Sequence, residues 1–257
     1  RFFETETIEV INTPLKKLLS KTKNFLNLLF SHGEVITDLL GTDITRHSKV
    51  KEADIVVLHW VNSFISYKSV KLLVRLHKPI IWVMHDMWVF TGGCHYDAYC
   101  NNFKKQCGYC PYLGKKKKKD ISYWNLKKKQ ELFDSVNIHF VAISRWEMQC
   151  ALASTPLKEK KITWISNPLN VDIFRPLDRG KLRKKFNIAR KKVILFGADK
   201  ALENPTKGFK YLVEALNFIN GKDYCAICFG KAPEKKKIKP DHIEVQYIGT
   251  IRDEETL

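Results

Sequence analysis

The sequence predicts an α/β protein made of two halves, each built on a parallel β-sheet. Short apolar runs alternate with stretches of helical periodicity along most of the chain. This alternation breaks at residues 166–176, a segment that contains two prolines, and then starts again. Polar side chains follow several of the apolar runs, at the sheet edge where such proteins bind ligands. Together these observations favour a two-domain protein with an enzyme-like layout.

The apolar runs have the length and composition of strands that are buried on both faces. In chain order they are residues 53–61, 80–86, 139–144, 161–166, 191–198, 223–230 and 243–249. The helical stretches between them are residues 66–78, 124–133, 145–154 and 207–220. Because strands joined through a helix pair in parallel by right-handed crossovers, the pattern predicts a parallel sheet in each half.

The break in the pattern predicts the domain boundary. We place an N-terminal domain at residues 1–172 and a C-terminal domain at residues 173–257. The chain starts at Arg1 rather than Met and stops soon after the last predicted strand. We therefore interpret it as a fragment truncated at both ends, in which the first domain lacks its first strand and the second domain is incomplete.

Residues 14–30 carry leucine and phenylalanine at helical spacing, with lysines largely off that stripe. A helix that packs on the core and exposes a lysine-rich face fits this pattern. A basic helix lying on an anionic membrane fits it too. We favour the first interpretation and keep peripheral contact with the inner membrane face as the second.

Composition narrows the class of protein. The chain has 257 residues, of which 44% are hydrophobic, so a packed core is expected rather than disorder. Its net charge of +18 favours an anionic partner, such as nucleic acid, acidic lipid or a phosphorylated small molecule, although a lysine-rich solvated surface gives the same balance. We see no secretory signal or membrane-spanning run, and the seven cysteines do not resemble a secreted disulfide scaffold. A cytoplasmic protein is therefore expected.

Four cysteines lie close together in a loop predicted at residues 91–119. They are Cys94, Cys100, Cys107 and Cys110, with the spacing C-x5-C-x6-C-x2-C. Four thiolates suit a tetrahedral zinc ion, and a site closed by four of them would be structural. Free thiols or two disulfides remain the alternatives.

Several strings resemble one family in order and spacing. They are ADIVVLHWVN, KPIIWVMHDMWVFTGGCHY, the cysteine segment, VAISRW, ISNPLNVDIFRP, and LFGA followed by KGF. They resemble the family-4 retaining glycosyltransferases, in the branch that builds bacterial exopolysaccharide and surface glycans. The resemblance covers about residues 47–257. HDMWVFTGGCHY is long and specific, whereas KGF alone would be weak.

The resemblance implies the GT-B architecture, in which two Rossmann-like domains face a cleft. It implies transfer of a sugar, with retention, from a nucleotide-sugar donor to a glycan or lipid-linked glycan acceptor. The donor would lie mainly on the C-terminal domain and the acceptor on the N-terminal domain. His85 matches the family histidine that faces the donor sugar, and we take it as the catalytic candidate. Lys207 matches the lysine that holds the donor diphosphate.

Other candidate residues surround these two. A fixed cation at a helix start stabilises a departing diphosphate, and Gly208 beside Lys207 permits close approach. Gly197 ends the preceding strand, and by the resemblance Gly249 and Thr250 border the nucleotide base. Asn167 is expected to act at the interdomain turn rather than on a ligand.

The residues around His85 allow more than one role. Asp86 is expected to orient the loop that follows the strand. His59 holds a similar strand-end position, where we favour a structural role.

The family's glycine-rich acceptor loop and paired glutamates are absent from this sequence, so we expect the fragment alone to be inactive. Two alternatives remain: a basic, zinc-stapled nucleic-acid-binding protein, and an inactive glycosyltransferase-like partner module. Because the cysteines sit inside a long α/β alternation, we expect no nucleic-acid partner.

Overall fold

The computed structural model describes residues 35, 41–62, 64–114, 117–188, 192–198, 204–219, 221–231 and 243–253. The basic helix expected at residues 14–30 lies outside these residues and stays a prediction. The chain divides into two compact units, Arg1–Asn167 and Pro168–Leu257. The division falls a few residues before the boundary expected at residue 172.

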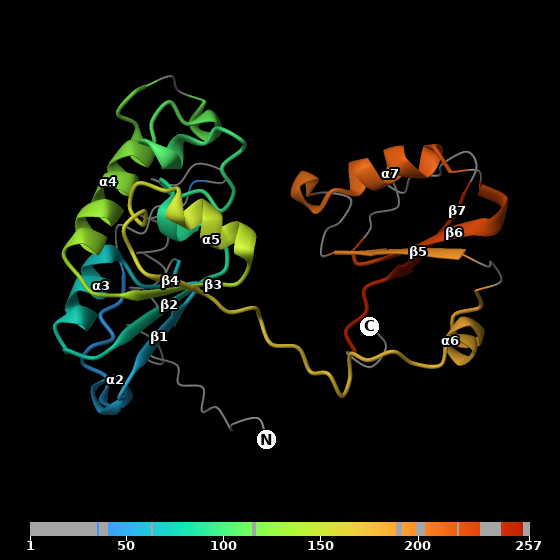
Figure 1. Cartoon of the computed structure of the whole chain (residues 1–257), viewed down its shortest axis with the longest axis horizontal. Coiled ribbons are helices and arrows are strands. Elements are labelled where there is room, and N and C mark those ends of the chain that lie inside the picture. Colours follow the sequence, from blue (N-terminus) through green and yellow to red (C-terminus); the bar gives the residue numbers. More distant parts are fainter. Residues whose placement is uncertain are drawn as a thin grey trace, which may run out of the picture. The chain divides into compact units, whose positions relative to one another are not determined.

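The first unit contains a parallel sheet of four described strands (Figure 1). They are β1 (Val56–His59), β2 (Ile80–Met84), β3 (His139–Ala142) and β4 (Ile162–Trp164), and they pair in chain order. Each strand falls inside an apolar run that predicted it. Because all four run in the same direction, their carboxyl ends share one edge of the sheet.

Four described α-helices accompany this sheet. They are α2 (Ser48–Glu52), α3 (Tyr67–Val74), α4 (Ile121–Asp134) and α5 (Arg145–Leu152). The last three begin at caps that the sequence supplies, namely Ser66, Asp120 and Ser144, whose side chains accept hydrogen bonds from backbone N–H groups of the first turn. Consecutive parallel strands with right-handed crossovers place their connecting helices on one face of the sheet.

The core of the first unit lies between this face and the helices. The side chains of Ile80, Trp82 and Met84 alternate along β2 and are buried. The Trp82 ring meets Phe133 of α4 edge-on at 5.9 Å and stacks on Phe140 of β3 at 6.4 Å. These aromatic contacts fix α4 against the middle of the sheet.

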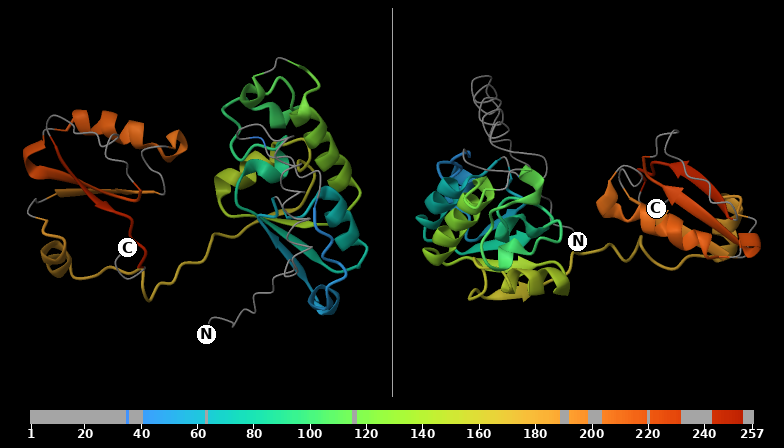
Figure 2. Two further views of the ribbon diagram at one scale, coloured as in Figure 1. Left: turned by 180° about the vertical axis from the view of Figure 1, so that it is seen from behind. Right: turned by 90° about the horizontal axis from the view of Figure 1, so that it is seen from above.

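The second unit has a smaller parallel sheet with the order β5-β6-β7. Its described strands are β5 (Lys192–Gly197), β6 (Tyr224–Phe229) and β7 (Glu244–Gly249), and its described α-helices are α6 (Arg179–Lys185) and α7 (Phe209–Asn217). Helix α7 covers one face of the sheet and α6 lies toward the other (Figures 1 and 2). On the α7 side, Leu216, Ala226 and Ile243 form the buried cluster.

Short 3-10 helices occupy the loops. They are η1 (Met87–Phe90), η2 (Asn102–Lys104), η3 (Pro111–Leu113), η4 (Pro205–Lys207) and η5 (Gly221–Asp223). No helix in the part of the chain that the structure describes is both long and apolar enough to cross a lipid bilayer. The predicted α/β class with parallel sheets is confirmed in both units.

Candidate active site

Two histidines meet at the carboxyl edge of the first sheet. His59 is the last residue of β1, and His85 directly follows β2. The register pairs His59 with Val83, which brings the two rings to neighbouring strand ends. The Nδ1 atom of His59 lies 2.9 Å from Nε2 of His85, within hydrogen-bonding distance. Burial, and secondly the charge of His85, lower the pKa of His59 from its ordinary value. The neutral ring of His59 is therefore favoured near pH 7.

Asp86 turns away from this pair and joins His95. Its Oδ2 atom lies 2.7 Å from Nδ1 of His95, and its Oδ1 atom accepts a hydrogen bond from the backbone N–H of Trp88 at 2.7 Å. The backbone N–H of Met87 donates to the carbonyl of His95 at 3.1 Å. Asp86 thus closes the loop after β2 onto itself. Sequence reasoning expected this orienting role for Asp86 but missed His95.

Helix α4 supports the same loop from the core. Lys129 is fully buried, and its Nζ atom donates to the carbonyls of Trp88 and Thr91. The Nδ2 atom of Asn125 donates to the carbonyl of Gly92 at 3.1 Å. Sequence reasoning singled out neither side chain. Lys129 stands in a lysine-rich helix, and such a pattern predicts a solvated surface.

Exposed aromatic side chains lie near the strand ends. Trp60, next to His59, is 65% exposed and meets the His95 ring edge-on at 5.9 Å. Its φ of +28° is uncommon for a bulky residue, and strain of this kind is found at functional sites. Arg145 stacks its guanidinium over Trp164 at 4.4 Å.

Glu147 is a buried acid at the start of α5. It is 3% exposed, and its Oε2 atom accepts a hydrogen bond from the backbone N–H of Ile143 at 2.8 Å. Burial raises the pKa of Glu147 to about 7, against the opposing effect of that hydrogen bond, and the charge of Asp86 raises it further. Its titration therefore falls near physiological pH.

The cysteine loop was expected to hold a zinc ion. Cys94, Cys100, Cys107 and Cys110 are free thiols that border one small cavity. Nevertheless, no group of three or more histidine, cysteine, aspartate or glutamate side chains is placed to hold a metal ion among the described residues. Burial raises the pKa of Cys94 to about 11 and that of Cys107 to about 12, so both are neutral thiols while no metal is bound. The structure therefore gives the zinc prediction no support.

The candidate donor residues gather around the start of α7 and the strand ends of the second unit. Lys207 ends η4 and is exposed, and Gly208, with φ of +76°, precedes the first turn of α7. Among the residues that the structure describes, no side chain caps that turn, so the first N–H groups of α7 have no capping partner there.

The glycines at the strand ends have different environments. Gly249 ends β7 with φ of +76°, and a Cβ atom there would meet open space. A Cβ atom at Gly197 would lie 1.9 Å from the Phe229 ring, so packing within the unit accounts for this glycine. Thr250 is exposed beside Gly249, and Asn167 is exposed at the end of the first unit.

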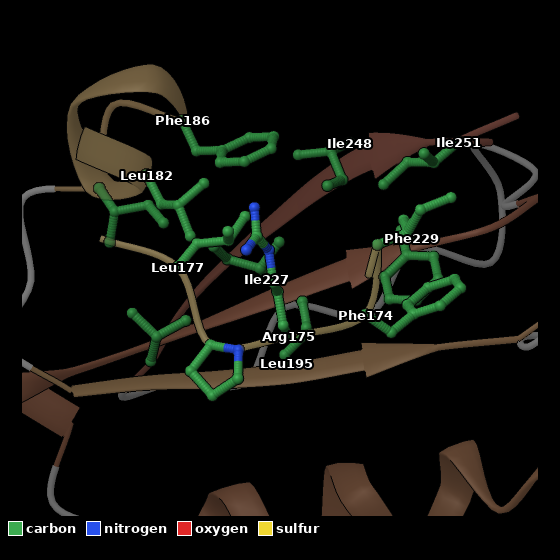
Figure 3. A pocket seen from close by; sticks show the side chains of 14 residues that line it. Phe174, Arg175, Leu177, Leu182, Phe186, Leu195, Ile227, Phe229, Ile248 and Ile251 are labelled. Atoms are coloured by element: carbon green, nitrogen blue, oxygen red, sulfur yellow. The ribbon is translucent and has the colours of Figure 1, made fainter. Parts of the chain in front are cut away.

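An apolar cavity of about 490 Å³ lies on the other face of the second sheet (Figure 3). Leu195, Ile227 and Ile248 reach it from the three strands, while Leu182 and Phe186 reach it from the α6 side. Its lining contains one charged residue, Arg175. Such a lining does not suit a diphosphate, and we do not place the donor phosphates there.

Comparisons with known proteins agree with this architecture. The chain matches no protein-family profile. Over 67 residues, 23% of this chain and 16% of the relative, it is 34% identical to the "Putative colanic acid biosynthesis glycosyl transferase WcaC" of Escherichia coli (strain K12). It is also similar to the crystal structure of Anabaena Alr3699/HepE in complex with UDP, with a TM-score of 0.50 and 15% identity.

The structural match covers 79% of this chain and 50% of the HepE chain, so the chain spans about half the length of that protein. It supports the α/β fold with parallel sheets that GT-B glycosyltransferases have, as the sequence resemblance implied.

Proposed function

We propose that the chain is part of a glycosyltransferase that uses a nucleotide-sugar donor and transfers the sugar, with retention, to a glycan or lipid-linked glycan. The observation that carries the proposal is the start of α7, where Lys207, Gly208 and uncapped backbone N–H groups come together. The UDP bound in the HepE structure supports a nucleoside diphosphate as the ligand class.

The leaving group explains why such a site is needed. Breaking the bond between sugar and diphosphate builds negative charge on the departing oxygen. A fixed ammonium group and the positive end of a helix stabilise that charge, and losing one such contact raises the barrier by about 3 kcal/mol. Lys207 provides the ammonium group, and Gly208 lets a phosphate approach the first turn of α7.

The first unit would supply the sugar side of the reaction. His85 is exposed at the sheet edge and can exchange hydrogen bonds with a sugar hydroxyl. Gly249 and Thr250 would border the base, and Asn167 would act at the hinge between the units. Gly197 would act through the packing of Phe229 rather than by touching the donor. Zinc has no role in this proposal.

The proposal is tested by nucleotide binding to the protein and to two lysine variants. UDP, GDP and ADP are titrated separately while the midpoint of thermal unfolding, Tm, is followed. We expect one of them to raise Tm in the wild type. In Lys207→Ala its affinity should fall about 10- to 100-fold, because the diphosphate loses a hydrogen bond to a charged group, which is worth about 1.5–3 kcal/mol.

Lys210→Ala is the matched control. Lys210 is exposed in the first turn of α7, and its ammonium group lies 3.7 Å from Glu214. Removing it takes away the same charge but leaves Lys207 and Gly208 in place, so nucleotide affinity should fall much less than in Lys207→Ala. Equal losses in both variants would indicate a general effect of charge and overturn the site. The absence of any Tm shift with all three nucleotides would overturn the proposed function.

A further inference from the structure

We propose that His59 is a positioning residue, which fixes the ring tautomer of His85 and so sets the direction of the hydrogen bond that His85 offers to a sugar. This role rests on the proposed function. The tautomer itself is a property of the protein alone and is measured without a substrate.

The distance between the two facing ring nitrogens decides how the ring protons are shared. At 2.9 Å, Nδ1 of His59 and Nε2 of His85 share one hydrogen atom, because two bare nitrogens would repel and two N–H groups would clash. Two neutral imidazoles carry two ring protons in total. One lies in the shared bond, and the other must lie on one of the two outer nitrogens, Nε2 of His59 or Nδ1 of His85.

The direction of the shared bond therefore decides what His85 offers at its outer nitrogen. If His59 donates, Nδ1 of His85 carries a proton and is a donor. If His85 donates, its Nδ1 is bare and is an acceptor. We assign the donor role in the shared bond to His59. Its lowered pKa makes its ring a weaker acceptor of a proton, which favours that direction. His85 is then the Nδ1–H tautomer.

Other neighbours of His85 do not compete for this role. The adjacent carboxylate of Asp86 would be the usual partner of a histidine, but its Oδ2 atom faces His95 and its Oδ1 atom accepts from Trp88. Within the part of the chain that the structure describes, His59 is the side chain hydrogen-bonded to the His85 ring. The orientation of His85 is thus set from the neighbouring strand rather than from its own loop.

A donor at Nδ1 of His85 gives this site a defined selectivity. A sugar hydroxyl accepts from it, and so does a group that can only accept, such as a carboxylate or a carbonyl oxygen. A group that can only donate is rejected, because the N–H group would be left without a partner. We therefore expect the donor sugar to present an oxygen with an available lone pair to His85.

Nitrogen-15 spectra of histidine-labelled protein at pH 8 test the assignment, because bare and protonated ring nitrogens resonate at separate positions. In the wild type, His85 should show a protonated Nδ1 and a bare Nε2. In His59→Phe, which removes both ring nitrogens, the His85 ring should lose this tautomer in favour of protonated Nε2. In His59→Asn, the side-chain amide can take the place of Nδ1 and donate, so the wild-type tautomer should return.

His139 gives an internal control for folding. Its Nε2 atom lies 2.9 Å from the Thr163 hydroxyl in the same sheet, so its signals should not move in either variant of His59. A wild-type His85 with a protonated Nε2, or an unchanged His85 spectrum in His59→Phe, would overturn the inference. The result does not depend on nucleotide binding, so failure of the tautomer assignment and failure of the proposed function are separate outcomes.

Discussion

The ammonium group of Lys129 lies 3.9 Å from the centre of the Trp88 ring, inside the core of the first unit. It also donates to the carbonyls of Trp88, within η1, and of Thr91, which directly follows η1. A buried cation persists only where hydrogen bonds and an aromatic face replace its water. Lys129 therefore fixes the loop that follows His85 and Asp86 from the side opposite to solvent.

We expect Lys129→Met to lower the free energy of unfolding by about 2–4 kcal/mol. Methionine fills much of the space but leaves two carbonyl oxygens without their donor. Urea unfolding measures the change. The control is Lys128→Met, one residue earlier on the exposed face of α4, which should stay within about 0.5 kcal/mol of the wild type. Equal stability of the two variants would show that Lys129 contributes nothing at this position.

Glu147 should give the protein a characteristic dependence of stability on pH. Its pKa is raised from 4.5 to about 7 by burial, so the folded state binds the proton more tightly than the unfolded state does. This contribution to stability is present below pH 4.5 and is lost as pH rises through about 7. Over that range the loss amounts to at most about 3 kcal/mol.

Glu147→Gln isolates this effect, because glutamine keeps an oxygen to accept from Ile143 and does not titrate. Relative to the wild type, the variant should gain up to about 3 kcal/mol of stability between pH 4.5 and pH 8. Other titrating groups cancel in the comparison of the two proteins. A difference in unfolding free energy that stays constant across this range would contradict the raised pKa.

The backbone conformation at Trp60 predicts that glycine is tolerated there at least as well as alanine. Alanine and glycine both remove the exposed ring, but only glycine adopts φ of +28° without strain. Trp60→Gly should therefore unfold at a urea concentration at least as high as Trp60→Ala, since the relieved strain of about 1 kcal/mol offsets the entropy of glycine in the unfolded chain.

Trp146 supplies the opposite case. It is 57% exposed and lies within helix α5, where glycine costs about 1 kcal/mol relative to alanine. Trp146→Gly should therefore be less stable than Trp146→Ala. If the glycine variant were less stable than the alanine variant at both positions, backbone strain at Trp60 would be excluded.

The apolar runs predicted the positions of the described strands, but not the burial of both their faces. Val57 of β1 and Leu195 of β5 are 48% and 61% exposed, so an apolar run shows that a strand is present without showing what covers it. Sequence reasoning missed α2 and α6, and the reason is physical. Neither helix has a buried residue, so neither shows an apolar stripe. Each is marked instead by a capping side chain, His47 or Asp178, and such caps carry little signal in a polar segment.

The site was predicted in part. His85 and Asp86 stand in a specific string, and their strand-end position follows from the alternation. The pairing of His85 with His59 depends on the register between β1 and β2, which no pattern within one strand reveals. The contacts of Lys129 and His95 depend on how the loop folds back, and the sequence carries no local mark of that path.

The last prediction concerns the cysteine loop. Because burial raises the pKa of Cys94 to about 11 and that of Cys107 to about 12, both thiols should be almost fully protonated at pH 8. Only the thiolate reacts with iodoacetamide, so we expect each to react more than about 100-fold more slowly than an ordinary cysteine. Cys100, which is half-buried and borders the cavity, should react first.

Mass spectrometry of peptides after timed alkylation measures the rate at each cysteine. Alkylation in urea, where all sites should react alike, is the control. Three results together would contradict the neutral-thiol loop and restore the predicted zinc site. Cys100 would be protected together with the other three cysteines, a chelator would remove the protection, and elemental analysis would find about one zinc ion per chain.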